Sequence, residues 1–294
     1  MSHDNAPTTA GEADVKGLDV VLITYNRPSY TALSLPRLLD TCPADSRVWV
    51  WHNGGDQQVL EEVRRHSDHP RFHRFHHSEE NVGLRPAINW LWTEAQGEFL
   101  SKVDDDSLME PGWVERLVEA QRAWNGFGVL GSWRFLPEDY DEALAAPKVR
   151  DVHGVTLLEN LWVQGSGHLF RRELVDELGV LTPGRSFPSW CIDAARAGYV
   201  NGWPMPFVRE EHMDDPRHPH TLFTNDAAFQ ELRPLSAKAT GVDSVAEWLE
   251  QTRQDARTVQ GASLDWRSRY GWRRKLIHAR RRARALVTRR SPWT

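Results

Sequence analysis

Residues 98–106 read Glu-Phe-Leu-Ser-Lys-Val-Asp-Asp-Asp, an apolar run that passes directly into three adjacent carboxylates. Two upstream stretches have the same form. Leu18-Asp-Val-Val-Leu-Ile-Thr-Tyr25 stops at Asn26-Arg27-Pro28, and Arg47-Val-Trp-Val-Trp-His-Asn53 stops at Gly54-Gly55. Short β-branched runs that end in turn residues predict buried strands. The sequence therefore predicts three strands whose last residues are polar.

Helical spacing separates these strands, over about 29–40, 57–66 and 86–95, with a short further strand at 72–77. Strands that alternate with helices predict an α/β fold with a mostly parallel central sheet flanked by helices. In such open sheets ligands bind beyond the carboxyl ends of the strands. We therefore expect the polar strand ends to converge on one binding site.

The aspartate triplet, Asp104, Asp105 and Asp106, is the strongest chemical signal in this half of the chain. Adjacent carboxylates repel one another unless a cation or a basic group lies close by. Hard oxygen ligands suit Mg²⁺ or Mn²⁺, which proteins commonly share with substrate phosphates. The alternative is a solvated acidic turn, but the position directly after a buried strand favours a metal site.

The second half is less regular. Trp203–Val208 contains prolines, so we expect a strand at the edge of the sheet. Further helices are expected over 113–124, 172–178, 190–197, 242–258 and 272–287, and further strands over 127–135 and 162–170. The predicted organisation is a disordered tail at 1–17, a catalytic domain at 18–210 and a helical C-terminal extension at 211–294.

Composition describes a globular chain of 294 residues with 40% hydrophobic residues and a net charge of −5. Nine basic residues and no acidic ones follow Gly271, which leaves the preceding part with a charge of −14. Such a tail can bind an anionic membrane, the acidic body or a second copy. The two cysteines, the absence of an apolar run of about 20 residues and a polar N-terminus predict a cytoplasmic protein, with peripheral membrane contact as an alternative.

Four segments in order carry a family resemblance. VVLITYNRP, VWVWHNGGD, NVGLRPAINWLW and FLSKVDDDSLMEPGWVERL, followed by GSGHLFRRELVDELG, resemble the family 2 glycosyltransferases of the GT-A fold. The resemblance implies transfer of a sugar from a nucleoside diphosphate of the UDP, GDP or dTDP type. The acceptor would be a saccharide or small molecule. It also implies a metal-dependent and inverting reaction.

The resemblance also implies residue roles. The nucleotide-sugar would contact Thr24, Tyr25, Asn26, Arg27, Asn53, Asn81, Gly83, Arg85, Asp104 and Asp105. Asp106 would ligate the metal. A histidine after the last core strand is a further ligand in some GT-A enzymes, and His212 has that position, with His218 and His220 as neighbours in competition. The alternative for Asn53, Asn81 and Gly83 is a purely structural role in turns.

The catalytic base is predicted from the segment SFPSWCIDAARAGY, which ends at Tyr199. The family's acidic pair is absent there, and Asp193 is the nearest carboxylate. Asp193 could instead pair with Arg196, in which case Glu210, Glu211 or Asp214 supplies the base, or the reaction is not inverting. The acceptor is expected beside Gln164–His168, where Trp133, Trp162 and Trp190 are candidates for stacking on a sugar ring.

Two other functions compete with the transferase. A sugar nucleotidyltransferase needs a glycine-rich, basic phosphate loop near the first strand, and TYNRPSY has no glycine. A polyanion-binding protein would act through the basic tail, but nucleic-acid binding needs basic and aromatic residues across a folded face. The acidic body argues against that, so no nucleic-acid partner is expected.

Overall fold

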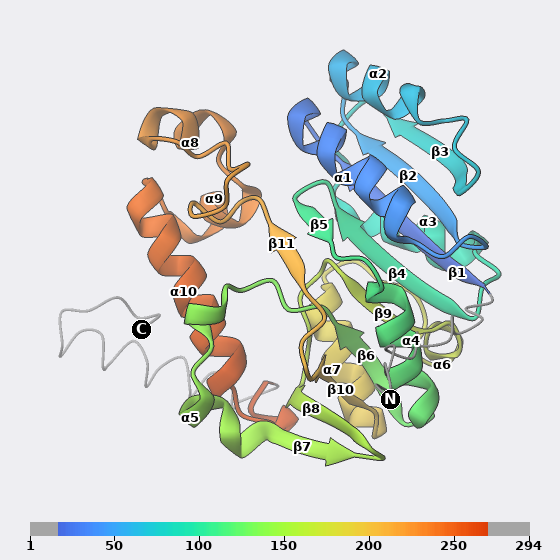
Figure 1. Cartoon of the computed structure of the whole chain (residues 1–294), viewed down its shortest axis with the longest axis vertical. Coiled ribbons are helices and arrows are strands. Elements are labelled where there is room, and N and C mark those ends of the chain that lie inside the picture. The colour runs from blue at the N-terminus through green and yellow to red at the C-terminus, as the bar shows by residue number, and fades with distance from the viewer. Residues whose placement is uncertain (1–16, 270–294) are drawn as a thin grey trace, which may run out of the picture.

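The computed structural model describes residues 17–269, and a nine-stranded sheet forms its centre (Figure 1). The strands of this sheet are β1 (Leu18–Thr24), β2 (Arg47–Asn53), β3 (Phe72–Ser78), β4 (Phe99–Asp104), β6 (Phe127–Gly131), β7 (Val149–Val152), β8 (Val155–Asn160), β9 (His168–Arg171) and β10 (Val200–Pro204). Their order is β3-β2-β1-β4-β9-β6-β10-β8-β7. A separate antiparallel pair joins β5 (Ser107–Met109) to β11 (Glu210–His212).

The helices α1 to α7 alternate with the strands along the chain, and α8 to α10 follow the last strand. They are α1 (Pro28–Thr41), α2 (Gln57–Arg65), α3 (Leu84–Glu94), α4 (Trp113–Ala123), α5 (Glu142–Ala145), α6 (Glu173–Leu178), α7 (Phe187–Ala197), α8 (Asp226–Leu232), α9 (Leu235–Thr240) and α10 (Val245–Gly261). Short 3₁₀ turns are η1 (Pro137–Asp139), η2 (Ala146–Lys148) and η3 (Trp266–Arg269). The predicted α/β class, with its central sheet, flanking helices and C-terminal helices, is confirmed.

Parallel pairing brings the carboxyl ends of the first strands to one edge. β1 pairs with β2 on one side and with β4 on the other, so Thr24 lies beside His52 and Ile23 beside Asp104. β9 then pairs antiparallel with both β4 and β6. The polar ends of β1, β2 and β4 therefore share one rim, as the sequence predicts.

The core has two layers because strand side chains alternate between the faces of the sheet. On β1, Val21 and Ile23 pack against α3 and α7, whereas Val20 and Leu22 face α1 and α4. All four are buried, and burying such a side chain contributes about 1.5–3 kcal/mol. Packing on both faces fixes the strand positions and hence the rim.

The second half differs in detail from the prediction. β10 spans Val200–Pro204 rather than Trp203–Val208 and lies inside the sheet between β6 and β8, so the edge-strand prediction is wrong. Pro204 is tolerated because it ends the strand. Of the predicted strand at 162–170, only the part from His168 is extended, and the strand predicted at 127–135 ends at Gly131.

Cys42 and Cys191 are buried free thiols. Within residues 17–269, every helix is too short or too polar to cross a membrane. The predicted helix at 272–287, the N-terminal tail and the basic tail after Gly271 lie outside the described residues.

Candidate functional site

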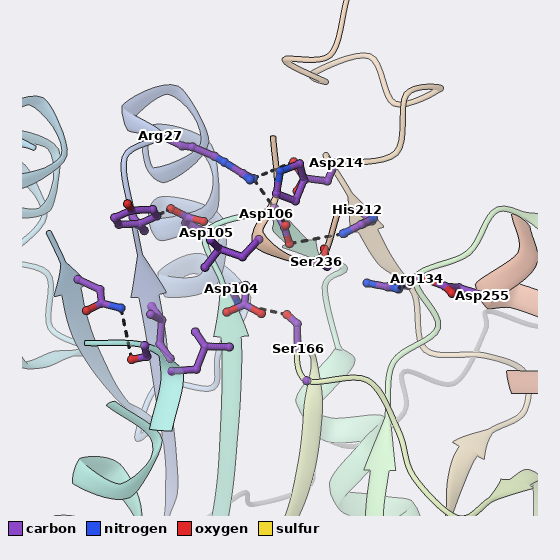
Figure 2. A pocket seen from close by; sticks show the side chains of 18 of the residues that line it. Arg27, Asp104, Asp105, Asp106, Arg134, Ser166, His212, Asp214, Ser236 and Asp255 are labelled. Carbon is purple, nitrogen blue, oxygen red and sulfur yellow. Dashed lines mark hydrogen bonds and ion pairs between the residues drawn. The ribbon is translucent and has the colours of Figure 1, made fainter. Parts of the chain in front are cut away.

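The rim opens into a cavity of about 470 Å³ whose walls come from both halves of the chain. The strand-end wall contributes Tyr25, Arg27, Asn53 and the aspartate triplet. Turns after β3 contribute Asn81 and Gly83. The other walls come from β11, the loop before β9 and the helices α9 and α10. Figure 2 shows the labelled acidic side chains gathered around this space.

Each aspartate of the triplet has a different partner. Asp104 accepts a hydrogen bond from Lys102 Nζ at 2.5 Å, and its backbone nitrogen donates to Ser166 Oγ at 3.1 Å. Asp105 accepts from the backbone nitrogen of Tyr25 at 2.8 Å. Burial raises the pKa of Asp105 to about 7. Only Asp106 points toward the acidic and imidazole groups of β11 and its following loop.

Pairing of β5 with β11 brings His212 and Asp214 close to Asp106. His212 lies opposite Ser107, and the backbone nitrogen of Met213 donates to the Asp106 carbonyl at 2.8 Å. As a result His212 Nε2 comes within 3.6 Å of an Asp106 carboxylate oxygen. One possible ligand atom each from Asp106, His212 and Asp214 lies within 4.8 Å of the other two.

Arg27 balances part of the negative charge. Its Nη1 donates to Asp214 Oδ1 at 2.8 Å and lies 3.7 Å from Asp106 Oδ2 (Figure 2). Burial opposes ionisation of Asp106, but the charges of His212 and Arg27 outweigh it and hold its pKa below the usual range. Burial and the Asp106 charge raise the pKa of Asp214 to about 7.

The cluster fits a divalent cation. Two carboxylates and one imidazole converge, and Mn²⁺ or Mg²⁺ commonly accepts such oxygen-rich sets, with imidazole favouring Mn²⁺. Burial and the negative charge of Asp106 raise the pKa of Asp214, so a nearby positive charge would favour its ionised form. A cation between these groups would supply that charge.

The side of the cavity at the ends of β2 and β3 is organised by Asn53. Its Nδ2 donates to Asn81 Oδ1 at 2.8 Å, and its Oδ1 accepts from the Val82 nitrogen at 2.8 Å. Gly83 has φ +80°, a conformation that favours glycine, and precedes α3. Asn53 and Asn81 therefore hold a turn, and both also line the cavity.

The model of glycosyl transferase family 2 matches residues 19–179, more than half of the chain. The chain belongs to glycosyl transferase family 2. This assignment confirms the predicted family.

Three solved structures resemble the fold of this family 2 glycosyltransferase. The mannosyltransferase PcManGT from Pyrobaculum calidifontis, in complex with GDP-Man and Mn²⁺, is 20% identical, with a TM-score of 0.57 over 95% of this chain and 82% of that one. TarS 1–349 from S. aureus is 13% identical, with a TM-score of 0.50 over 85% and 88%. GalNAc-T7 with UDP, GalNAc and Mn²⁺ is 14% identical, with a TM-score of 0.50 over 68% and 44%. A comparison with curated protein sequences gives no match.

The cavity of the transferase includes most, but not all, of the predicted donor and metal residues. Those that line it are Tyr25, Arg27, Asn53, Asn81, Gly83, Asp104, Asp105, Asp106 and His212. Thr24 is instead buried against His52, with 3.0 Å between Thr24 Oγ1 and His52 Nδ1. Asn26 and the exposed Arg85 are not among the lining residues.

Asp193 lies on α7 and is not among the lining residues. It accepts from Arg185 Nε at 3.0 Å and from Arg196 Nη1 at 3.1 Å. Trp133 and Trp190 are at most 1% exposed, so their rings lie in the core and present no surface for a sugar. The predicted acceptor segment contributes only Gly165 and Ser166 to the cavity.

Several site residues were not predicted. Asp214 is named from the sequence as an alternative base and not as a cation ligand, although it lies only two residues after His212. Arg134, Trp248, Gln251 and Asp255 also line the cavity. No local motif marks these four residues, since the fold alone brings α10 to the rim.

Proposed function

We propose that the chain transfers a sugar from a nucleoside-diphosphate sugar to an acceptor hydroxyl, with inversion and with a divalent cation, Mn²⁺ or Mg²⁺. The observation that carries this proposal is the convergence of Asp106, His212 and Asp214 at the strand-end rim. Family membership supports sugar transfer. The presence of GDP-Man, UDP and Mn²⁺ in similar structures supports a UDP or GDP donor, with dTDP as an alternative.

Asp106, His212 and Asp214 would hold the cation. When bound, the cation would neutralise the negative charge that develops on the departing diphosphate. Arg27, already bonded to Asp214 at 2.8 Å, adds a guanidinium that can donate charge-assisted hydrogen bonds to phosphate oxygens. Arg217 is not placed for that role, because it does not line the cavity and its guanidinium bonds Asp139 and Asp215.

The donor would lie along the strand-end wall. Tyr25, Asn53, Asn81 and Gly83 would surround the base and ribose, because they form the part of the cavity away from the cation cluster. Asp104 would accept hydrogen bonds from ribose or sugar hydroxyls, since Lys102 holds its carboxylate at the cavity. The roles of Thr24, Asn26 and Arg85 stay predictions.

The acceptor proton needs a base, and an inverting transfer uses a carboxylate. Asp193 stays a prediction that the cavity geometry does not support. Among the alternatives, Glu211 does not line the cavity and Asp214 belongs to the cation cluster. We therefore propose Glu210, which lines the cavity and accepts from Ser107 Oγ at 2.6 Å and Ser132 Oγ at 2.5 Å.

The division into a catalytic domain at 18–210 and an extension at 211–294 stays a proposal. So do the cytoplasmic location and the contacts of the basic tail with a membrane or a second copy. In this arrangement the extension would take part in catalysis, since His212, Asp214 and Asp255 lie in it.

Thermal unfolding with a panel of nucleoside diphosphates tests the proposal. With Mn²⁺ present, UDP or GDP at about 100 times its dissociation constant should stabilise the protein by about 2.7 kcal/mol, which raises Tm by several degrees. Asp106→Ala should abolish this shift, whereas the exposed control Glu119→Ala should retain it. A shift with polyanions alone, unchanged in Asp106→Ala, would instead support a polyanion-binding protein.

A further inference from the structure

The family model matches residues 19–179, and the wall opposite the strand ends comes from residues that follow this range. It begins at α9 and continues along α10, and Arg134 lies beside it (Figure 2). Its side chains at the cavity are Leu235, Ser236, Thr240, Trp248, Gln251 and Asp255. Apart from Arg134, this far wall thus lies outside the part of the chain that the family model matches.

Direct bonds fix the far wall against the rest of the protein. Trp248 Nε1 donates to the backbone oxygen of Asp214 at 2.7 Å, so α10 is tied to the cation cluster. At the other end of α10, Gln260 Nε2 donates to the Asp139 oxygen at 2.8 Å and Gln260 Oε1 accepts from the Asp141 nitrogen at 2.7 Å. The far wall therefore presents its side chains at a defined position.

The polar groups of this wall form a continuous set. Gln251 Nε2 donates to Asp255 Oδ1 at 2.8 Å, and Arg134 Nη2 lies 3.8 Å from Asp255 Oδ2. Arg134 Nε is shielded from solvent and bonds no protein acceptor. A guanidinium donor, an amide and a carboxylate thus lie together at the cavity, with hydrogen-bonding capacity that the protein does not use up.

The residue types of the far wall favour a ligand with hydroxyl groups over a diphosphate. The residues of α9 and α10 that line the cavity include no Lys, Arg or His, so this side does not suit a diphosphate. Carboxylates, amides and guanidinium groups together can donate to and accept from neighbouring hydroxyls of one molecule. Leu235, 62% exposed, adds an apolar surface for the carbon face of a sugar ring.

We propose that Arg134, Gln251 and Asp255 form the acceptor subsite and bind hydroxyl groups of a saccharide. The inference rests on the proposed transferase function, because it assigns the donor to the opposite wall. Asp255 accepts hydrogen bonds from the hydroxyls, Gln251 donates or accepts one, and the Arg134 guanidinium, whose side chain is 27% exposed, donates a third. The acceptor is thereby held between α10 and the rim.

Saturation-transfer difference NMR can test the subsite without knowledge of the natural acceptor. The probes are methyl glycosides of glucose, galactose, mannose and N-acetylglucosamine, each added to the full chain with Mn²⁺ and UDP or GDP. At least one glycoside should bind the wild type. Asp255→Ala and Gln251→Ala should each weaken that binding about ten-fold or more, whereas Glu250→Ala, on the exposed side of α10, should not.

Nucleotide binding separates this inference from the proposed function. Asp255→Ala should keep the thermal shift with nucleoside diphosphate and Mn²⁺, because Asp255 lies outside the cation cluster; absence of that shift in the wild type contradicts the proposed function instead. The subsite is overturned if no glycoside binds the wild type, or if both α10 variants bind as tightly as it does. Should Asp255→Ala unfold, Asp255→Asn gives the same comparison.

Discussion

Lys102 is buried beside the aspartate triplet, and its ammonium group has two oxygen partners. It donates to Asp104 at 2.5 Å and to the Gly165 carbonyl at 2.7 Å. The side chain is 3% exposed, so its charge is compensated by Asp104 rather than by water. Because one carboxylate of the triplet is neutralised in this way, three adjacent aspartates can end a buried strand. The pair also orients Asp104 toward the cavity.

Lys102→Met should leave the partly exposed Asp104 carboxylate without its ionic partner. Because Asp104 can still contact water in the cavity, the loss should be smaller than for a fully buried pair, about 1–3 kcal/mol of unfolding free energy. Urea denaturation followed by tryptophan fluorescence measures this loss. Lys238→Met, an exposed change on α9, is the matched control, and equal stability of the two variants would show that Lys102 has no such role.

Lys148, in η2, gives a pH dependence with a defined sign. Its ammonium donates to Val259 at the end of α10 and to Asn160 Oδ1, and burial lowers its pKa to about 8. Between pH 8 and the normal lysine pKa the unfolded chain binds more protons than the folded one. Stability should therefore rise with pH over this interval, by up to about 3 kcal/mol, and this term should be constant below pH 8.

Urea unfolding at a series of pH values from 7.5 to 10.5 checks the Lys148 prediction. Lys148→Met should lack this contribution, so the difference in stability between wild type and variant should change across the interval. A constant difference would mean that the pKa of Lys148 is the same in the folded and the unfolded chain. The comparison uses the change with pH, because the substitution also alters packing.

The helix α10 contributes to the site in two ways. It contributes to the cavity and contacts a backbone oxygen of the cation cluster through Trp248, which is 6% exposed. Phe229 and Trp248 also belong to one small apolar cluster. These contacts, together with the bonds of Gln260 to Asp139 and Asp141, hold α10 beside the cavity.

Trp248→Phe should keep the aromatic packing and remove the bond to Asp214. We expect a loss of about 1 kcal/mol in stability and a several-fold weaker affinity for Mn²⁺ in the presence of UDP or GDP. Isothermal titration calorimetry measures the affinity. Trp124→Phe, far from the cavity lining, should change stability without changing Mn²⁺ binding. The idea that α10 positions the cluster fails if the two variants bind Mn²⁺ equally well.

Viewed as a whole, the molecule places its site between two parts of the chain that differ in how well the sequence predicts them (Figure 1). β1, β2 and β4 are apolar runs that end in turn residues, so local pattern alone locates them and their polar ends. Asp106 and Arg27 are predicted as site residues because they come shortly after the ends of β4 and β1. This part of the site and the fold class are predictable because the relevant information is local in sequence.

The remainder depends on contacts between distant residues. β9 inserts between β4 and β6, and no feature of His168–Arg171 specifies that pairing. β10 reads as an edge strand from its proline but lies inside the sheet. Spacing along the chain points to Asp193 as the catalytic base. In the structure Asp193 instead bonds Arg185 and Arg196 and does not line the cavity. Gln251 and Asp255 look like ordinary polar positions of an amphipathic helix until the fold brings α10 to the cavity.

Diffraction at the manganese absorption edge tests the central claim most directly. Crystals of the full chain grown with Mn²⁺ and GDP or UDP should show one strong anomalous peak at the rim. Carboxylate oxygens of Asp106 and Asp214 and a ring nitrogen of His212 should lie within about 2.0–2.3 Å of it, with diphosphate oxygens completing the shell. A nucleotide bound in the cavity with no peak near these three residues, or with Mn²⁺ elsewhere, would contradict the account.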